Sequence, residues 1–259
     1  MKKFFVSFVL IALLIVIFEF IFSELDFTII PEIVAAAIVS LLYSQWKWIG
    51  RYFNMRINRY TLPNLPSSTR IRISYAYLIR IKIQGKYLLV RGKYNKYQPP
   101  GGVYHYYDRE IERQFGFKRD ETHGDDNDIR GTIELSSLKK FLKWRKTEKN
   151  RETGFTREFN EELIQSKILS EKEFSGAEGE FITTKFKGIE FSEHHQIYEL
   201  LIFDIFQIIL DDSQRKVLLA LLKEPNDRCY FSSAAEIKSL GVSGDNYVET
   251  IAKHSKLIL

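Results

Sequence analysis

Two long apolar runs fill residues 1–50, and they constrain the architecture of this chain more than any other feature. The first extends from Phe4 to Phe22 with a single charged residue, Glu19, and the second extends from Phe27 to about Tyr43. Each run approaches the roughly 20 residues that a helix needs to cross a bilayer core. Because only a short polar break separates them, the pattern predicts a transmembrane hairpin with helices at about residues 4–22 and 27–48.

The charged residues that flank these runs predict an orientation. Positive charge near membrane ends stays cytoplasmic, and here it lies outside both runs, whereas the connecting loop carries only Glu24 and Asp26. Both termini are therefore expected in the cytoplasm. The flanking cations are Lys2, Lys3, Lys47, Arg51, Arg56 and Arg59. A cleaved signal peptide and a pair of buried core helices remain the alternatives for these runs.

The rest of the chain has the size and composition of one domain. Residues 51–70 form a basic linker that contains two prolines, and residues 71–259 are enough for a full hydrophobic core. The single cysteine, Cys229, excludes an internal disulfide and fits a reducing compartment. A net charge of +5 weakly favours anionic lipid or a phosphorylated ligand.

Periodicity in this second part predicts both strands and helices. From Arg70 to Ile83 the odd positions are apolar and basic residues occupy even positions, which predicts a strand with one buried face. The turn Gln84-Gly85-Lys86 and the run Tyr87–Arg91 complete a predicted hairpin. Further predicted strands are Phe181–Phe186, Ile197–Leu210 and Cys229–Ser232, and predicted helices are Ser137–Lys146, Gly154–Ile168, Asp212–Leu222 and Ala234–Leu240. The fold class is therefore α+β, a mixed sheet with flanking helices, following the two-helix transmembrane hairpin.

Three glutamates mark the predicted helix Gly154–Ile168. Glu158, Glu161 and Glu162 are spaced i, i+3 and i+4, so they share one helix face opposite an apolar stripe. An ordinary solvated face is one interpretation. The other is a divalent cation site, with Mg²⁺ as the candidate metal, because Mg²⁺ prefers oxygen ligands and substrate phosphates.

The order of these motifs resembles a Nudix domain. A strand at Tyr87–Arg91 precedes Pro100-Gly101-Gly102, and Arg157-Glu158-Phe159-Asn160-Glu161-Glu162 matches the second half of the Nudix signature. The family's active members use the helix glutamates to hold Mg²⁺, which polarises a phosphate and activates water. The resemblance therefore implies a Nudix-like fold and Mg²⁺ as a possible cofactor at these glutamates.

This sequence departs from the signature in ways that disfavour hydrolysis. An insertion at about residues 103–152 splits the motif. The signature's earlier glutamate falls on Lys149, and its terminal glycine falls on Ile164. A receptor that kept the nucleotide cleft is thus favoured over an enzyme. A membrane-anchored hydrolase of a nucleoside diphosphate derivative is the main alternative, and a tethered protein-binding scaffold is the third.

A hairpin followed by a split, degenerate Nudix domain resembles the SMODS-associated Nudix membrane effectors of bacterial cyclic-oligonucleotide-based antiphage signalling (CBASS). This resemblance implies a multi-pass protein of the bacterial inner membrane. It also implies sensing of a cyclic di- or oligonucleotide, assembly into a homo-oligomer on activation, and membrane disruption that leads to abortive infection. Membrane lipid is an expected partner and DNA is not.

The predicted ligand-binding residues come from the matched segments and their neighbours. Tyrosine rings can stack on a base, and arginines can bind phosphates. Tyrosines in strands are also common core residues, and Arg157 of a Nudix domain commonly pairs with a helix carboxylate. The predicted ligand-binding set is Arg91, Tyr97, Gly101, Gly102, Tyr104 and Arg157, and the predicted metal ligands are Glu158, Glu161 and Glu162.

Overall fold

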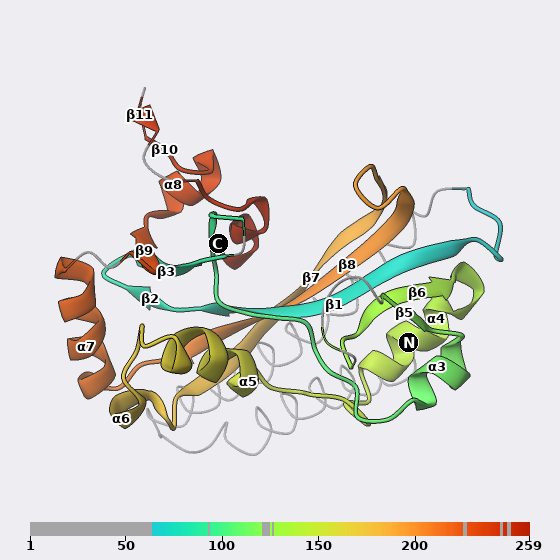
Figure 1. Cartoon of the computed structure of the whole chain (residues 1–259), viewed down its shortest axis with the longest axis horizontal. Helices are drawn as coiled ribbons and strands as arrows, with labels where there is room; N and C mark the ends of the chain where they lie inside the picture. The colour runs from blue at the N-terminus through green and yellow to red at the C-terminus, as the bar shows by residue number, and fades with distance from the viewer. Residues whose placement is uncertain are drawn as a thin grey trace, which may run out of the picture. The chain divides into compact units, whose positions relative to one another are not determined.

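The computed structural model describes residues 64–92, 94–120, 125, 127–224, 227–243, 246–247 and 250–259. A five-stranded mixed sheet forms its centre, in the strand order β5-β6-β1-β8-β7 (Figure 1). Strand β1 is antiparallel to β6 and parallel to β8, and β8 is antiparallel to β7. The strands are β1 (Arg70–Arg80), β5 (Lys118–Arg119), β6 (Arg130–Glu134), β7 (Glu178–Ser192) and β8 (Ile197–Ile209).

A second, smaller sheet follows β1 through the predicted hairpin. Strands β2 and β3 are antiparallel, and β3 also pairs with β4 and β9. Gln84 and Gly85 both have positive φ, as a two-residue hairpin turn of this hand requires. The strands of this sheet are β2 (Lys82–Ile83), β3 (Lys86–Arg91), β4 (Tyr97–Gln98) and β9 (Cys229–Ser232). A separate short pair joins β10 (Val242–Ser243) and β11 (Asn246–Tyr247).

Short helices flank these sheets, and several match the predicted positions. The helix predicted at Asp212–Leu222 is α7 (Asp212–Lys223), which begins with a capping box at Asp211. The helix predicted at Ala234–Leu240 is α8 (Ala234–Ser239), and Leu240 ends it in the left-handed conformation. The remaining helices are α3 (Glu110–Phe115), η1 (Leu135–Ser137), α4 (Leu138–Arg145), α5 (Thr156–Phe159), η2 (Asn160–Gln165), α6 (Glu171–Phe174) and η3 (Lys253–Ile258).

Strand β1 is buried on both faces, which differs from the prediction of one buried face. Its odd positions, such as Ile73 and Tyr77, belong to the main core with residues of α4, α5 and α7. Leu78, at an even position, belongs to a second core with residues of β3, α8 and η3. The even-position cation Arg72 is also buried, and it pairs with Glu199 and Asp120. Elements on both sides of the sheet therefore cover β1.

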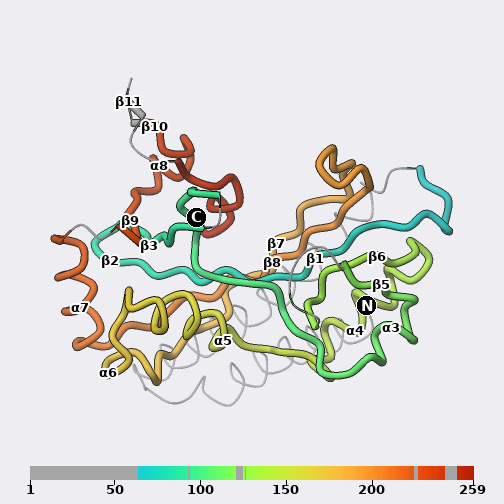
Figure 2. Tube along the Cα trace, in the orientation of Figure 1, coloured from blue at the N-terminus to red at the C-terminus, as the bar shows by residue number. Residues whose placement is uncertain are grey.

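The segment at residues 103–152 extends the main sheet instead of forming a separate loop. Its strand β6 pairs along β1 from Arg70↔Glu134 to Ser74↔Arg130, and β5 adds the outer strand. The chain first runs from β4 alongside β1 before it reaches α3 (Figure 2). Helices α3 and α4 of the insertion lie at one end of the sheet, and α5 to α7, which follow the insertion, lie toward the other (Figure 1).

No helix in the described ranges is long and apolar enough to cross a bilayer. The longest of them, α7, has 12 residues, against the roughly 20 that a crossing needs. This finding corrects two predictions. Among the described residues the fold class is α+β, a mixed sheet with flanking helices and no transmembrane helix, and the predicted multi-pass inner-membrane localisation is withdrawn. The apolar runs at residues 4–22 and 27–48 lie outside the described residues.

Candidate functional site

Two consecutive glycines allow the chain to lie between β1 and a cluster of carboxylates. Backbone hydrogen bonds join Ile79 N to Pro100 O (2.8 Å) and Tyr77 N to Gly102 O (2.9 Å). Gly101 has a φ of +150°, and a Cβ there would lie 2.2 Å from Tyr77 O. A Cβ at Gly102 would lie 1.8 Å from Glu158 Oε1. Gly101 needs glycine because of its backbone conformation and its close approach to the β1 backbone, whereas a side chain at Gly102 would force the Glu158 carboxylate to move.

The helix that carries the glutamates changes its winding within the motif. The sequence predicts one α-helix, but α5 is followed directly by η2, which is a π-helix. Phe155, Phe159 and Leu163 are buried, as the predicted core stripe requires, and they fix which face meets the sheet. A π-helical turn alters the angular spacing of the residues that follow it, and such turns are frequent at functional sites.

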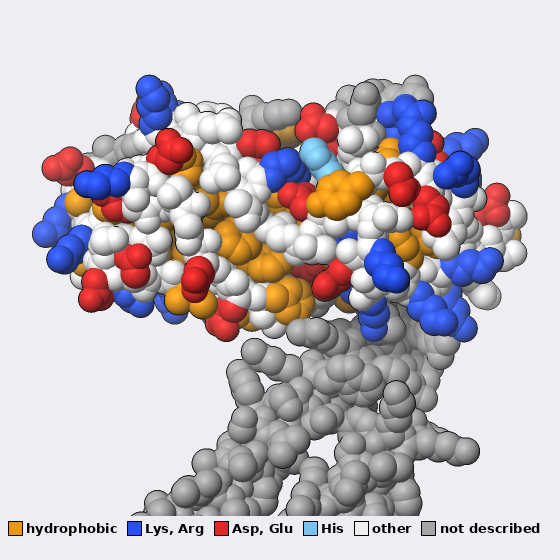
Figure 3. Space-filling view, turned by 90° about the horizontal axis from the view of Figure 1, so that it is seen from below, with side chains coloured by type: hydrophobic (Ala, Val, Ile, Leu, Met, Phe, Trp, Pro, Cys, Tyr) orange, Lys and Arg blue, Asp and Glu red, His pale blue; other side chains and the backbone are white. Residues whose placement is uncertain are grey.

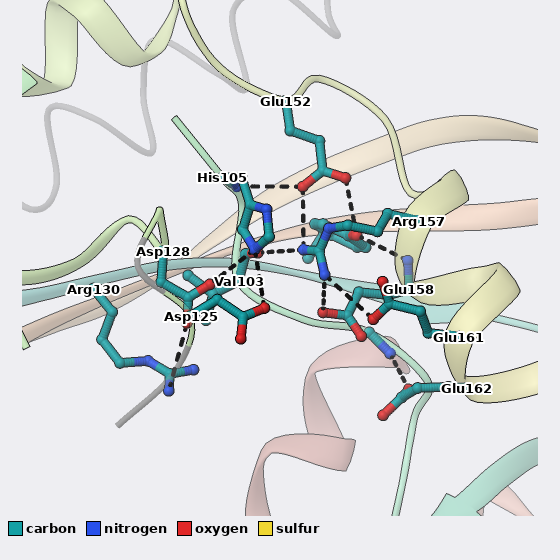
Figure 4. A network of polar contacts seen from close by, with 12 residues as sticks. Val103, His105, Asp125, Asp128, Arg130, Glu152, Arg157, Glu158, Glu161 and Glu162 are labelled. Atoms are coloured by element: carbon teal, nitrogen blue, oxygen red, sulfur yellow. Dashed lines mark hydrogen bonds and ion pairs between the residues drawn. The ribbon is translucent and has the colours of Figure 1, made fainter. Parts of the chain in front are cut away.

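Arg157 lies at the centre of the carboxylate cluster (Figure 4). Its Nη1 donates to Glu158 Oε1 (2.7 Å) and lies 3.5 Å from Glu161 Oε2. Its Nη2 donates to Val103 O (2.8 Å) and Glu152 Oε2 (3.3 Å). Burial alone would lower the pKa of Arg157. The negative or electron-rich groups of Tyr77, Glu152 and Glu158 raise it by more, so the net pKa lies above the usual range of arginine. The guanidinium is therefore a permanent cation inside the cluster.

Glu152 is a site residue that the signature did not identify. Besides Arg157, its carboxylate accepts hydrogen bonds from His105 N (3.3 Å) and from the Tyr77 hydroxyl (3.5 Å). The signature's earlier glutamate falls on Lys149, which is exposed. Glu152 lies five positions before Arg157, in the segment between α4 and α5. No sequence spacing indicated this contact.

Glu162 is the most buried carboxylate of the predicted metal set. Its Oε2 accepts a hydrogen bond from Gly101 N (2.8 Å). Burial raises the pKa of Glu162 to about 7, aided by the charges of Glu158 and Glu161 and opposed by the Gly101 N–H. Near neutral pH this side chain therefore exchanges between its neutral and ionised forms.

The raised pKa of Glu162 predicts a pH-dependent stability. The ordinary glutamate pKa is about 4.5, so the folded chain binds more protons than the unfolded chain from about pH 4.5 to 7, and stability falls as pH rises through this window. Glutamine cannot ionise and keeps an oxygen acceptor for Gly101 N. Glu162→Gln should thus match the wild type near pH 4.5 and exceed its free energy of unfolding by about 2–3 kcal/mol at pH 8.

Urea unfolding at the two pH values measures this difference. Glu161→Gln is the matched control because its side chain is 46% exposed, and its effect should stay below about 1 kcal/mol at either pH. A difference between Glu162→Gln and the wild type that does not grow with pH would contradict the assignment.

The donor set fits Mg²⁺ in kind. Glu158, Glu161 and Glu162 supply carboxylate oxygens on one helix, and these would be the ligands of such an ion. Arg157 competes for Glu158 and Glu161, and Glu162 must first lose its proton. Metal binding at this site is therefore expected to weaken as pH falls below 7.

The structure brings some of the predicted ligand-binding residues together and separates others. Gly101, Gly102 and Arg157 adjoin the glutamates. Arg91 and Tyr97 lie on β3 and β4, where the guanidinium is 5.6 Å from the ring centroid. Tyr97 is buried in the second core.

Tyr104 lies inside the main core and not on a ligand-facing surface. Its side chain is 1% exposed, its ring lies between those of Tyr75 and Tyr77, and its hydroxyl donates to Asp204. A base cannot stack on a ring covered in this way. The exposed tyrosines of the region are Tyr94 and Tyr107, at 81% and 70%.

Comparison with known families supports the Nudix-like domain predicted from the sequence. A family model described as the SMODS-associated NUDIX domain matches residues 70–259. A comparison with curated proteins found no match. The match confirms the predicted Nudix-like domain and supports an involvement in CBASS-like defence signalling. Because it covers well over half of the sequence, the chain belongs to the family of SMODS-associated NUDIX domains.

Proposed function

We propose that this chain is a nucleotide-sensing component of a CBASS-like defence system. In this proposal the Nudix-like domain binds a cyclic di- or oligonucleotide and does not hydrolyse it. The membrane disruption predicted from the sequence depended on the transmembrane hairpin and forms no part of the proposal. The predicted homo-oligomer stays a prediction.

The observation that carries the proposal is the position of Arg157. Hydrolysis by a Nudix site needs carboxylates that are free to hold metal and to activate water. Here Arg157 contacts Glu152, Glu158 and Glu161 at 2.7–3.5 Å. The remaining carboxylate, Glu162, is neutral for part of the time because its pKa is about 7. This arrangement supports a nucleotide site with poor hydrolytic capacity.

The charge of the cluster defines the conditions for binding. Phosphates would meet several carboxylates at this site, so a divalent cation must neutralise the repulsion. The surface seen from below the sheet carries apolar side chains among charged groups of both signs, so it offers no uniformly basic alternative (Figure 3). Ligand binding is therefore expected to be stronger with Mg²⁺, although competition from Arg157 weakens the binding of the ion itself. Tyr107 N donates to Asn150 O, close in sequence to Glu152, and the exposed ring of Tyr107 is the candidate for base stacking.

Calorimetry of the full-length chain against cyclic di- and trinucleotides, with and without Mg²⁺, tests the proposal. We expect one ligand to bind with a Kd in the micromolar range or tighter, and the affinity to fall by about tenfold or more without Mg²⁺. Glu161→Gln should weaken binding, whereas Glu180→Gln, an exposed glutamate on β7, should not. If no cyclic nucleotide binds under either condition, the sensing proposal is wrong.

A further inference from the structure

A second cluster of metal-ligating side chains lies next to the glutamate site. His105 Nε2 is 3.3 Å from Asp128 Oδ1 and 3.5 Å from Asp125 Oδ2. The three ligand atoms lie within 4.8 Å of one another (Figure 4). We propose that His105, Asp125 and Asp128 bind a divalent transition-metal ion of the Zn²⁺ or Mn²⁺ class. The site is separate from the predicted Mg²⁺ ligands Glu158, Glu161 and Glu162.

The imidazole nitrogen supplies an observation that is independent of the acidic residues. His105 Nε2 is sealed from solvent, and it has no hydrogen-bond partner among the described residues. Buried polar atoms are nearly always hydrogen-bonded, and leaving one unsatisfied is costly. This nitrogen lies within 3.5 Å of an oxygen of each aspartate without forming a hydrogen bond to either. A metal ion between them would satisfy all three groups.

The backbone holds two of the ligands in place without help from an ion. His105 and Asp128 form an antiparallel bridge, and the adjacent Tyr106 N donates to Asn127 O (2.9 Å). Arg130 Nη1 lies 3.8 Å from Asp128 Oδ2, so the other oxygen, Oδ1, faces the imidazole. Preorganised ligands of this kind, supported by a further charged partner, favour tight metal binding.

The ligand types define the class of ion. Imidazole suits Zn²⁺ and other transition metals, whereas Ca²⁺ and Mg²⁺ prefer oxygen ligands alone. Three protein ligands leave at least one position open to water or to an anionic ligand. His105, Asp125 and Asp128 all come from the insertion at about residues 103–152, so the segment that splits the Nudix motif would itself create this site.

Zinc titration of the full-length chain, stripped of metal by a chelator, tests the proposal. Calorimetry should show one equivalent of Zn²⁺ bound, and X-ray absorption should show one imidazole ligand. Asp125→Asn and His105→Gln should each weaken Zn²⁺ binding by about tenfold or more. The Asp125 side chain is 76% exposed, so its replacement leaves the fold intact even where His105→Gln does not fold. His194→Gln, a histidine in the turn between β7 and β8, and Glu161→Gln should bind Zn²⁺ as the wild type does.

Each other outcome would overturn the proposal. Absence of Zn²⁺ binding would leave only direct contacts between His105 and the two aspartates. Unchanged affinity in Asp125→Asn would exclude this cluster as the site. Loss of affinity in Glu161→Gln alone would place the ion at the glutamates.

Discussion

Replacing Asp204 with asparagine is expected to lower the free energy of unfolding by about 3–5 kcal/mol. Asp204 is 6% exposed and accepts hydrogen bonds from four side chains. Its Oδ2 accepts from the hydroxyls of Tyr75 and Tyr104, and its Oδ1 accepts from Thr184 Oγ1 (2.6 Å) and Arg145 Nη1 (3.4 Å). Asparagine removes the negative charge, so the buried guanidinium of Arg145 loses its counter-ion.

This network also explains how the insertion is attached to the sheet. Arg145 is the last residue of α4, and Asp204 lies on β8. Burial, followed by the charge of Asp204, raises the pKa of both Tyr75 and Tyr104, so both hydroxyls remain donors. Because Arg145 ties α4 to β8 through Asp204, Asp204→Asn should also make the insertion more susceptible to proteolysis.

Chemical denaturation measures the effect of Asp204→Asn, and Asp212→Asn provides the control. The control makes the same chemical change at the exposed first turn of α7 and should cost less than about 1 kcal/mol. Equal effects of the two variants would show that Arg145 and Asp204 do not form a buried pair.

Replacing Arg157 with methionine is expected to destabilise the chain by about 3 kcal/mol and to strengthen Mg²⁺ binding by about tenfold or more. Without the guanidinium, the largely buried carboxylates of Glu152 and Glu158 lose their cation. The same change frees the oxygens of Glu158 and Glu161 for a metal. Mg²⁺ should therefore raise the Tm of Arg157→Met more than that of the wild type.

Two further variants separate charge from geometry at this position. Arg157→Lys keeps the charge but loses the paired contacts, so its stability should fall between those of the wild type and Arg157→Met. Adding Glu158→Gln to Arg157→Met should recover part of the lost stability, because one unpaired charge is removed. A Tm that responds to Mg²⁺ equally in all variants would contradict competition between Arg157 and metal.

The local elements of the fold were predictable because their signals are short-range. The hairpin turn at Gln84-Gly85, the strand at Cys229–Ser232 and the helix from Asp212 follow from turn chemistry, alternation and capping. The burial of both faces of β1 was not predictable from alternation, since Arg72 occupies an even position and is paired by Glu199 from β8. Tertiary pairing thus determines whether a charged face is exposed.

In the candidate site too, some residues could be recognised from the sequence and others only from tertiary contacts. The glycines, Arg157 and the helix glutamates are recognisable from the Nudix signature, and the structure brings them together. Glu152 is contributed by folding of the insertion, and its distance from Arg157 in sequence carries no signal. Tyr104 could not be separated from a stacking residue by composition, because tyrosine serves both in sheet cores and in base recognition.

We propose that this Nudix-like domain binds a cyclic nucleotide without cleaving it. The most direct test incubates the full-length chain and Mg²⁺ with cyclic oligonucleotides and with nucleoside diphosphate derivatives, and separates the products by anion-exchange chromatography. We expect the bound cyclic nucleotide to be recovered intact and no diphosphate derivative to be turned over. Mg²⁺-dependent cleavage that is lost in Glu161→Gln would contradict it and would identify the protein as a hydrolase.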